Sequence, residues 1–233
     1  VLGTVSIDGL IASYTNITEQ DSFGSDEDPR AVERADVRAK DYQVRAVSER
    51  LIGSARLMTG VDVNGRFGLD ALDIYEDYDM SGALIATREN VSVDGASKRD
   101  AGAFVQLDGS VGPALTLSGG GRFDYVTTTN PGGFFGDHST SNSAFSGFVA
   151  ATAGPFEGLT FTGQVSRGFR DAVLSDRYYR GPTGRGFITG NPDLDPETSL
   201  QFDGAARYTA GRFRAAVNVY HYDIDNLIER YEV

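Results

Sequence analysis

Apolar and polar side chains alternate with a period of two along several stretches of this sequence. In 115–125 the odd positions are apolar or glycine, and the even positions are mostly polar. The same alternation occurs in 159–166 and in 200–208. Because successive side chains of a β-strand point to opposite faces, this period predicts strands with one apolar and one polar face.

Weaker versions of the pattern predict six further strands, which brings the expected total to nine. A slip in the alternation around Lys40-Asp41 is consistent with a β-bulge. Glycine, at 29 of 233 residues, and 25 Phe and Tyr residues fit a β-rich chain. The six additional strands are expected at 2–14, 34–48, 55–67, 101–110, 143–153 and 212–223.

The links between these strands alternate between short and long. Short links are expected at 49–54, 111–113, 154–158 and 209–211, and long polar links at 15–33, 68–100, 127–142 and 170–197. Outer-membrane barrels place short turns on the periplasmic side and long loops outside. The pattern therefore favours an all-β fold, an antiparallel transmembrane β-barrel segment, although a soluble β-sandwich has similar alternation.

Composition excludes several other classes of protein. The formal charge is −12, which argues against a nucleic-acid partner, because such binding relies on Lys and Arg. There is no Cys, and no apolar run exceeds four residues, so no transmembrane helix is expected. His138 and His221 are the only imidazoles, and neither has catalytic or metal-ligand spacing around it. We therefore expect no enzyme activity, no catalytic residues, no cofactor and no metal site.

Two motifs in the second half of the chain resemble a known family. Val165-Ser166-Arg167-Gly168-Phe169-Arg170 is followed after a loop by Thr189-Gly190-Asn191-Pro192-Asp193-Leu194-Asp195-Pro196-Glu197-Thr198-Ser199. This pair is similar to the "SRGFRAP" and "GNPxLxPE" boxes of TonB-dependent outer-membrane receptors. The strands at 102–106 and 115–124 also resemble strands of that family. The likeness is specific over 101–233, but Asp171-Ala172 stand where the family usually has Ala-Pro.

The resemblance implies a 22-stranded barrel, plugged by an N-terminal domain, that takes up a scarce nutrient with energy delivered through TonB. Nine strands are too few for such a barrel, so we expect residues 1–233 to be a partial barrel domain without the plug. The implied location is the outer membrane of a Gram-negative bacterium, in contact with its lipid. TonB and the plug are the partners implied for the full-length parent.

The polar face of the predicted strands would line the lumen of the barrel. The opposite apolar face would meet lipid, because a charge at the bilayer midplane costs about 2–4 kcal/mol in such barrels. Phe123 and Phe161 share the parity of the apolar set and are expected to face outward. The predicted lumen-facing residues are Arg122, Asp124, Gln164, Gln201, Asp203 and Arg207.

The long links differ in charge, and this difference is the only internal indication of the cargo. The 15–33 link holds six acidic residues against Arg30, whereas 177–185 is basic and has no acidic residue. We expect the side chains of its three arginines, Arg177, Arg180 and Arg185, to face outward and to take little part in packing. Guanidinium and phenol groups suit an anionic, oxygen-rich small molecule such as a ferric chelate. The predicted ligand-binding residues are Arg177, Tyr178, Tyr179, Arg180 and Arg185.

The expected function is a segment of a TonB-dependent receptor, whose most common cargo in the family is a ferric siderophore, with cobalamin and glycans as further options. Haem is disfavoured, because haem receptors of the family typically place a His between the two boxes and none occurs here. The alternatives are a passive, porin-like channel or a secretion barrel, and a soluble β-sheet binding module. The sequence identifies neither the cargo nor the strand count of the parent barrel.

Overall fold

A computed structural model of the chain describes residues 3–23, 29–183 and 186–230. Within these ranges, nine long antiparallel strands follow one another in a single curved sheet, and each pairs with its neighbours in the chain. This confirms the all-β fold and the open sheet that nine strands require. The strands are β1 (Thr4–Phe23), β2 (Pro29–Ile52), β3 (Ala55–Tyr78), β4 (Leu84–Ser110), β5 (Leu115–Asn130), β7 (His138–Phe156), β8 (Leu159–Arg170), β11 (Glu197–Ala210) and β12 (Phe213–Asp225).

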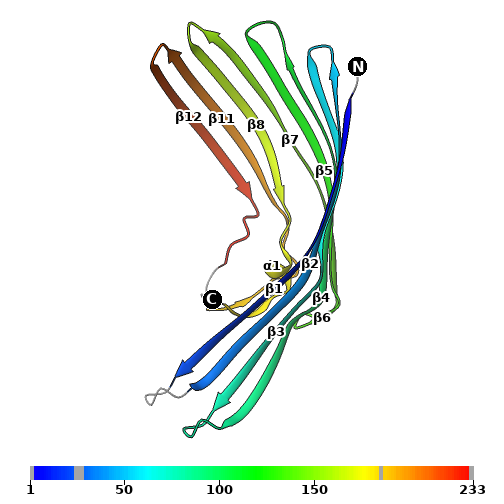
Figure 1. The fold of residues 1–233 in the computed structure, drawn as a ribbon, viewed down its shortest axis with the longest axis vertical. Helices are drawn as coiled ribbons and strands as arrows, with labels where there is room; N and C mark the ends of the chain where they lie inside the picture. The colour runs from blue at the N-terminus through cyan, green and yellow to red at the C-terminus, as the bar shows by residue number, and fades with distance from the viewer. Residues whose placement is uncertain (1–2, 24–28, 184–185, 231–233) are drawn as a thin grey trace.

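Short elements complete the described part of the fold. The two-residue strand β6 (Gly132–Gly133) pairs with β4, and β9 (Arg180–Thr183) pairs with β10 (Gly186–Thr189) in a separate hairpin. The helix α1 (Leu174–Tyr178) has five residues. Within the described ranges, no helix has the length and apolarity needed to cross a membrane. Figure 1 shows α1 on the concave side of the curved sheet.

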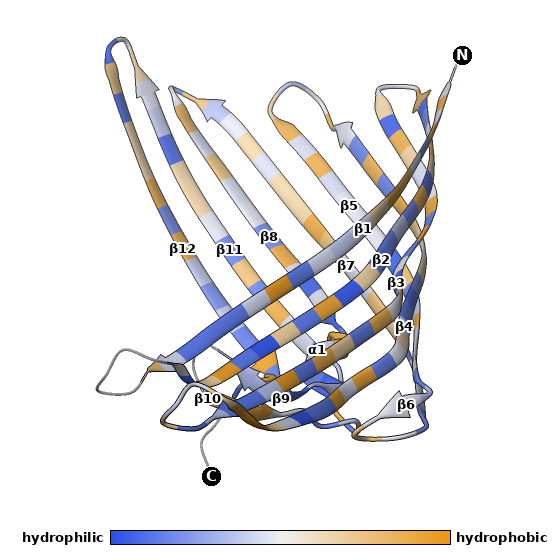
Figure 2. Cartoon of the chain, turned by 60° about the horizontal axis from the view of Figure 1, so that its bottom comes forward, coloured by the Kyte–Doolittle hydropathy of each residue, from blue (hydrophilic) through white to orange (hydrophobic). Residues whose placement is uncertain are grey.

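Tight turns gather at one end of the sheet and longer connections at the other (Figure 2). Gly53 and Gly211 begin two of the tight turns with φ of +63° and +57°, a conformation that glycine adopts without steric cost. The predicted slip near Lys40-Asp41 corresponds to a register shift in the β2–β3 pairing between Arg38 and Lys40. The extra residue at such a shift bends the strand locally.

Three of the predicted long links are wrong, because most of their residues are in strands. In 127–142, residues 127–130 belong to β5, 132–133 form β6, and 138–142 belong to β7. β1 and β2 continue through 15–23 and 29–33, and β3 and β4 reduce the 68–100 link to a turn at 79–83. The outer part of β1 is mostly polar, with Ile17 and Phe23 as its large apolar side chains, so the sequence shows no apolar face there that would reveal a strand. Backbone pairing continues there, and Arg34 of β2 donates to Glu19 of β1 at 2.7 Å.

The two faces of the sheet follow the predicted parity. Phe123 and Phe161 are 52% and 48% exposed and lie on the convex face. Exposed apolar side chains recur on this face along β1, β3 and β8. Buried side chains concentrate on the concave face around α1. Their apolar cluster consists of Ala39, Leu69, Ala71, Val93, Ala96, Leu174 and Tyr178.

Candidate functional site

In the connection between β8 and β11, the described residues 171–183 and 186–196 fold into the concave face of the sheet, and we call them the strap. Its first turn is α1, where the Asp176 carboxylate accepts a 3.3 Å hydrogen bond from the Val173 amide. The chain then returns beside α1, with Gly190 N donating to Tyr179 O at 2.8 Å. A side chain at Gly190 would collide with the Arg177 carbonyl 2.7 Å away, so this close return requires glycine.

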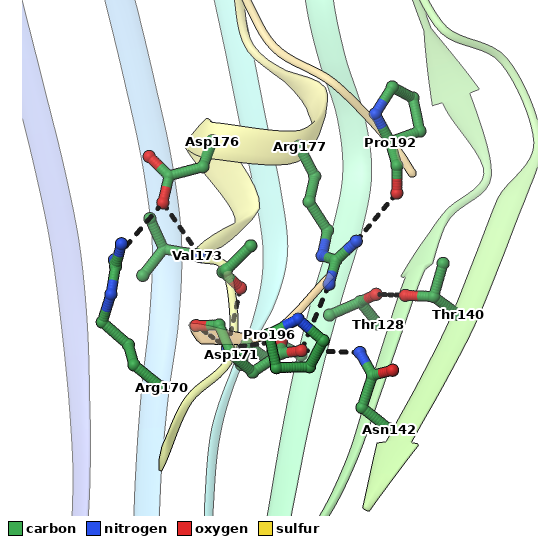
Figure 3. Close-up of polar contacts among 12 residues, drawn as sticks. Thr128, Thr140, Asn142, Arg170, Asp171, Val173, Asp176, Arg177, Pro192 and Pro196 are labelled. Atoms are coloured by element: carbon green, nitrogen blue, oxygen red, sulfur yellow. Dashed lines mark hydrogen bonds and ion pairs between the residues drawn. The ribbon is translucent and has the colours of Figure 1, made fainter. Parts of the chain in front are cut away.

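A buried group of charges holds the strap to the sheet (Figure 3). Asp171 and Arg177 form an ion pair of 3.1 Å, and their side chains are 2% and 1% exposed. Asp171 Oδ1 also accepts a 2.7 Å hydrogen bond from Asn142 of β7. Arg177 Nη1 donates to the Pro192 carbonyl at 2.8 Å. We call Lys98, Asn142, Asp171 and Arg177 the anchor.

Lys98 joins the anchor from β4, a strand far from Asp171 in the chain. Its ammonium donates to the carbonyls of Asp171 (3.2 Å) and Ala172 (2.8 Å). The same ammonium lies 2.9 Å from Asp171 Oδ2. This last contact is an ion pair, and Asp171 Oδ2 has no hydrogen-bond partner among the described residues. Two cations therefore neutralise one buried carboxylate.

The two sequence boxes meet at the base of the strap. Arg170, which ends β8, binds Glu197, which begins β11, through two hydrogen bonds of 2.5 and 2.6 Å. Glu197 also accepts from the Ile228 amide at 2.7 Å. These contacts, the Arg170 bonds first, lower the pKa of Glu197 to about 2. The pairing fixes the distance between the two ends of the strap.

The outer part of the strap covers an isolated carboxylate. Asp73 of β3 is fully buried, and its Oδ2 accepts a 2.9 Å hydrogen bond from Asn90, whereas Oδ1 has no hydrogen-bond partner among the described residues. Burial raises the pKa of Asp73. Tyr179 lies close by, and burial followed by the charge of Asp73 raises the pKa of its phenol. The Tyr179 hydroxyl donates to the Pro182 carbonyl at 2.7 Å.

Arg180 is the residue of the described strap that is best placed to meet a ligand. Its guanidinium lies 4.2 Å from the centre of the Phe134 ring and 5.0 Å from that of Phe187. The two Phe side chains are 51% and 58% exposed. The backbone of Arg180 is fixed, because its amide donates to Ser92 Oγ at 2.6 Å. The result is a cation in contact with two exposed aromatic side chains.

The expectation that the arginines of the basic run take little part in packing is wrong for Arg177, which is buried together with Tyr178. Both are fully buried, and the Tyr178 hydroxyl lies 3.3 Å from Thr128 Oγ1. The charge of Arg177 is matched by Asp171, which stands six residues earlier in the chain. Tyr179 and Arg180 are partly buried, and Arg185 lies outside the described residues.

The six residues predicted to face the lumen share the face that carries the strap. Thr128 of β5 contacts Tyr178 of the strap. Arg122 and Asp124 lie an even number of residues from Thr128 with no register shift between them, so their side chains point to the same face. The register then places Gln164 opposite Asp203. Arg122 donates two hydrogen bonds of 2.7 and 2.8 Å to Asp62 of β3 and one of 2.7 Å to Asp124. The remaining two residues on this face are Gln201 and Arg207.

Sequence reasoning missed most of the anchor. Lys98 and Asn142 stand 73 and 29 residues from Asp171, so no local spacing connects them. The departure from the family pattern at Asp171-Ala172 was the one signal that the sequence offered. In the structure, the aspartate at this position holds the anchor together, where the family pattern has alanine.

Comparison with known proteins gives consistent results. The family model described as "TonB dependent receptor-like, beta-barrel" matches residues 5–233. Among solved structures, "Copper transporter OprC" aligns with a TM-score of 0.68 at 18% identity, covering 95% of this chain and 36% of that one. FpvA of P. aeruginosa, bound to a heterologous pyoverdine and iron, aligns with a TM-score of 0.51 at 11% identity, covering 95% and 30%. The chain thus spans about a third of these structures. No curated protein matches it.

Proposed function

The chain belongs to the TonB-dependent receptor β-barrel family, and from this premise we propose that it forms part of the barrel of an outer-membrane receptor for active uptake of a scarce nutrient. We further propose that residues 1–233 are a partial barrel domain. In the full-length parent, a plug domain and TonB would complete the transport machinery. The concave face, with its six polar residues, would border the lumen, and the convex apolar face would meet lipid.

We propose that the cargo is an anionic, oxygen-rich chelate such as a ferric siderophore. The observation that carries this proposal is the guanidinium of Arg180, which lies over the rings of both Phe134 and Phe187. A guanidinium keeps its hydrogen-bonding edge when its faces stack on aromatic rings, and that edge matches paired oxygen atoms. The exposed ring faces offer additional stacking area for a flat ligand.

Uptake in cells tests the class of transporter. We expect uptake by the full-length receptor to stop in cells that lack TonB and to stop when the proton gradient is collapsed. A passive channel would admit the same cargo at an unchanged rate under both conditions. Unchanged uptake would therefore overturn the receptor proposal.

Binding to the purified full-length receptor tests the ligand site. Arg180→Gln should weaken binding of ferric citrate or a ferric tris-catecholate about tenfold or more, since a charge-assisted hydrogen bond contributes about 1.5–3 kcal/mol. Arg88→Gln is the matched control, because the Arg88 guanidinium also lies over a ring, that of Tyr75, but is already paired with Asp77 at 3.0 Å. Equal affinities for wild type and Arg180→Gln at low salt would remove this ligand site.

A further inference from the structure

A hollow of about 430 Å³ lies on the convex face, across β7, β8, β11 and β12. Its floor is a row of three small residues that lie opposite one another on neighbouring strands, Ala151, Gly163 and Gly204. Glycine and alanine leave the backbone almost bare, so the surface is lower there than around it. Larger side chains form the rim, which consists of Phe161, Val217 and Val219.

The hollow is apolar, and no side chain of the described residues fills it. A Cβ added at Gly163 would meet no atom within 4 Å. The one polar residue of the lining is Thr162, whose hydroxyl lies 3.1 Å from that of Thr152 on the opposite face of the sheet. A surface of this kind fits a hydrocarbon chain.

An arginine without a protein partner lies on the same face above the hollow. Arg167 is six residues after Phe161, and no register shift interrupts the pairing of β8 with β11, so its side chain points to the convex face. Arg167 is exposed and makes no hydrogen bond or ion pair with another described residue. Its cross-strand neighbours are Gly147 and Leu200. The carboxylate that the register places closest on this face is Asp223, one strand beyond Leu200.

The position of Arg167 along β8 matches the outer edge of a membrane. It lies nine residues after Gly158, a tight-turn glycine with φ of +91°. A barrel strand crosses the hydrocarbon core in about 9–11 residues, starting from short turns on the periplasmic side. Gly163 is four residues nearer that turn, or about 13 Å along the strand. This separation fits within one leaflet, whose hydrocarbon layer is about 15 Å thick.

We propose that the hollow and Arg167 form one binding site for a phosphorylated lipid of the outer leaflet. One acyl chain lies in the hollow, over Gly163 and Gly204, and the phosphate accepts hydrogen bonds from the Arg167 guanidinium. The planar fork of a guanidinium matches two phosphate oxygens, and the protein supplies no carboxylate that competes at this position. The inference rests on the proposed function, because it requires that the convex face meets lipid.

Native mass spectrometry of the full-length receptor in detergent tests the site. Dioleoylphosphatidic acid should bind at least tenfold more tightly than dioleoylglycerol, which has the same chains and no phosphate. Glycerol 3-phosphate, which has the phosphate and no chains, should not bind. Arg167→Gln and Gly163→Leu should each weaken binding of dioleoylphosphatidic acid at least tenfold. Equal affinities of wild type for the two lipids would overturn the site, and so would binding of glycerol 3-phosphate as tight as that of the lipid.

Arg99→Gln is the matched control for charge. Arg99 of β4 is exposed, has no hydrogen bond or ion pair with a described residue, and lies opposite Thr127, which shares the parity of Phe123 on the convex face. The exposed ring of Tyr125, two residues nearer the tight turn, lies below it. Arg99→Gln should therefore leave lipid binding unchanged.

Gly9→Leu is the matched control for Gly163→Leu. Gly9 lies on the same face of β1, where an added Cβ would meet only the Gln43 carbonyl, at 3.8 Å. Losses in the two controls as large as those in Arg167→Gln and Gly163→Leu would show general attraction to lipid and would overturn the site, as would unchanged binding in both site variants. The measurement uses neither cargo nor TonB, so its failure is distinct from failure of the receptor proposal.

Discussion

The β1–β4 side and the β8–β11 side of the molecule build their long connections in opposite ways. On the first side, strands of 20 to 27 residues continue past the apolar band as paired hairpins. On the second side, β8 and β11 have 12 and 14 residues, and the chain between them folds inward as the strap. Backbone hydrogen bonds between paired strands stabilise the long hairpins of β1–β4, whereas side-chain contacts hold the strap to the sheet.

Ion pairs in the two regions differ accordingly. Arg34 and Glu19 link β2 to β1 with side chains 44% and 49% exposed, whereas the side chains of Asp171 and Arg177 are almost completely buried. Exposed pairs contribute little because water competes for both charges, and a broken buried pair leaves a charge without compensation. Arginine and acidic residues therefore form solvated surface pairs on the β1–β4 side, whereas on the β8–β11 side they form buried tertiary contacts.

The largest effect is expected from breaking the buried pair. Arg177→Met should destabilise the docked strap by about 3–5 kcal/mol, because it leaves the Asp171 carboxylate buried with one cation fewer. Hydrogen exchange at the amides of Gly190 and Asn191, which donate to the carbonyls of Tyr179 and Asp176, measures this opening. Arg214→Met, at an exposed position of β12, is the control and should leave those amides protected. If these two amides remained protected in the Arg177→Met variant, the buried ion pair would not be what holds the strap in place.

The second-largest effect is expected from removing the buried ring of Tyr178 from the strap. Tyr178→Ala should cost about 3–5 kcal/mol of strap docking, because it empties a fully buried aromatic site. Tyr178→Phe keeps the ring and loses only the contact with Thr128, so it should cost about 1 kcal/mol. Exchange at the same amides ranks the two variants. If they opened the strap equally, the hydroxyl and not the ring would carry the attachment.

The base of the strap should respond to acid. The pKa of Glu197 is lowered to about 2 from 4.5, chiefly by Arg170, so its contribution to stability is complete above about pH 4.5 and is lost as pH falls toward 2. Wild type should therefore be more heat-resistant than Glu197→Gln at pH 6, and the difference should shrink by pH 3. Electrophoretic mobility shifts on heating measure it. A difference that is constant with pH would exclude the carboxylate as its source.

The smallest effect is expected on the β1–β4 side. Arg34→Ala should produce no measurable change in heat resistance, because its pair with Glu19 is solvated and the backbone pairing of β1 with β2 continues without it. The same assay as for Glu197→Gln makes the two regions directly comparable. A loss as large as that of Glu197→Gln would erase the distinction between the two sides of the molecule.

Sequence alone was sufficient where the two faces of a strand meet different surroundings. The alternation in 115–125 and 159–166 predicted the correct strands and the outward parity of Phe123 and Phe161. It failed in 15–23, where the sequence is mostly polar and the period of two disappears. Pairing there depends on hydrogen bonds of the backbone, which nearly any sequence can make.

The candidate site was less predictable for a different reason. The basic run at 177–180 was visible, but whether a charge is buried depends on partners distant in the chain. Lys98, which completes the anchor, lies in a strand that begins at Leu84. Arg180 was included among the candidate residues on composition, and its aromatic neighbour Phe134 comes from the connection after β5. Its role as a ligand contact stays a prediction.

The order of strands in the sheet has a consequence for how the molecule assembles. Each long strand pairs with its neighbours along the chain, so hairpins can add one after another, and the connection is short at every step except between β8 and β11. The strap breaks this rule, since Lys98 and Asp171 meet across 73 residues. We therefore expect the strap to dock last, onto a sheet already formed. Time-resolved thiol labelling of an Ala172→Cys variant, at a fully buried position of the strap, would show the thiol becoming inaccessible during refolding after the strands have paired.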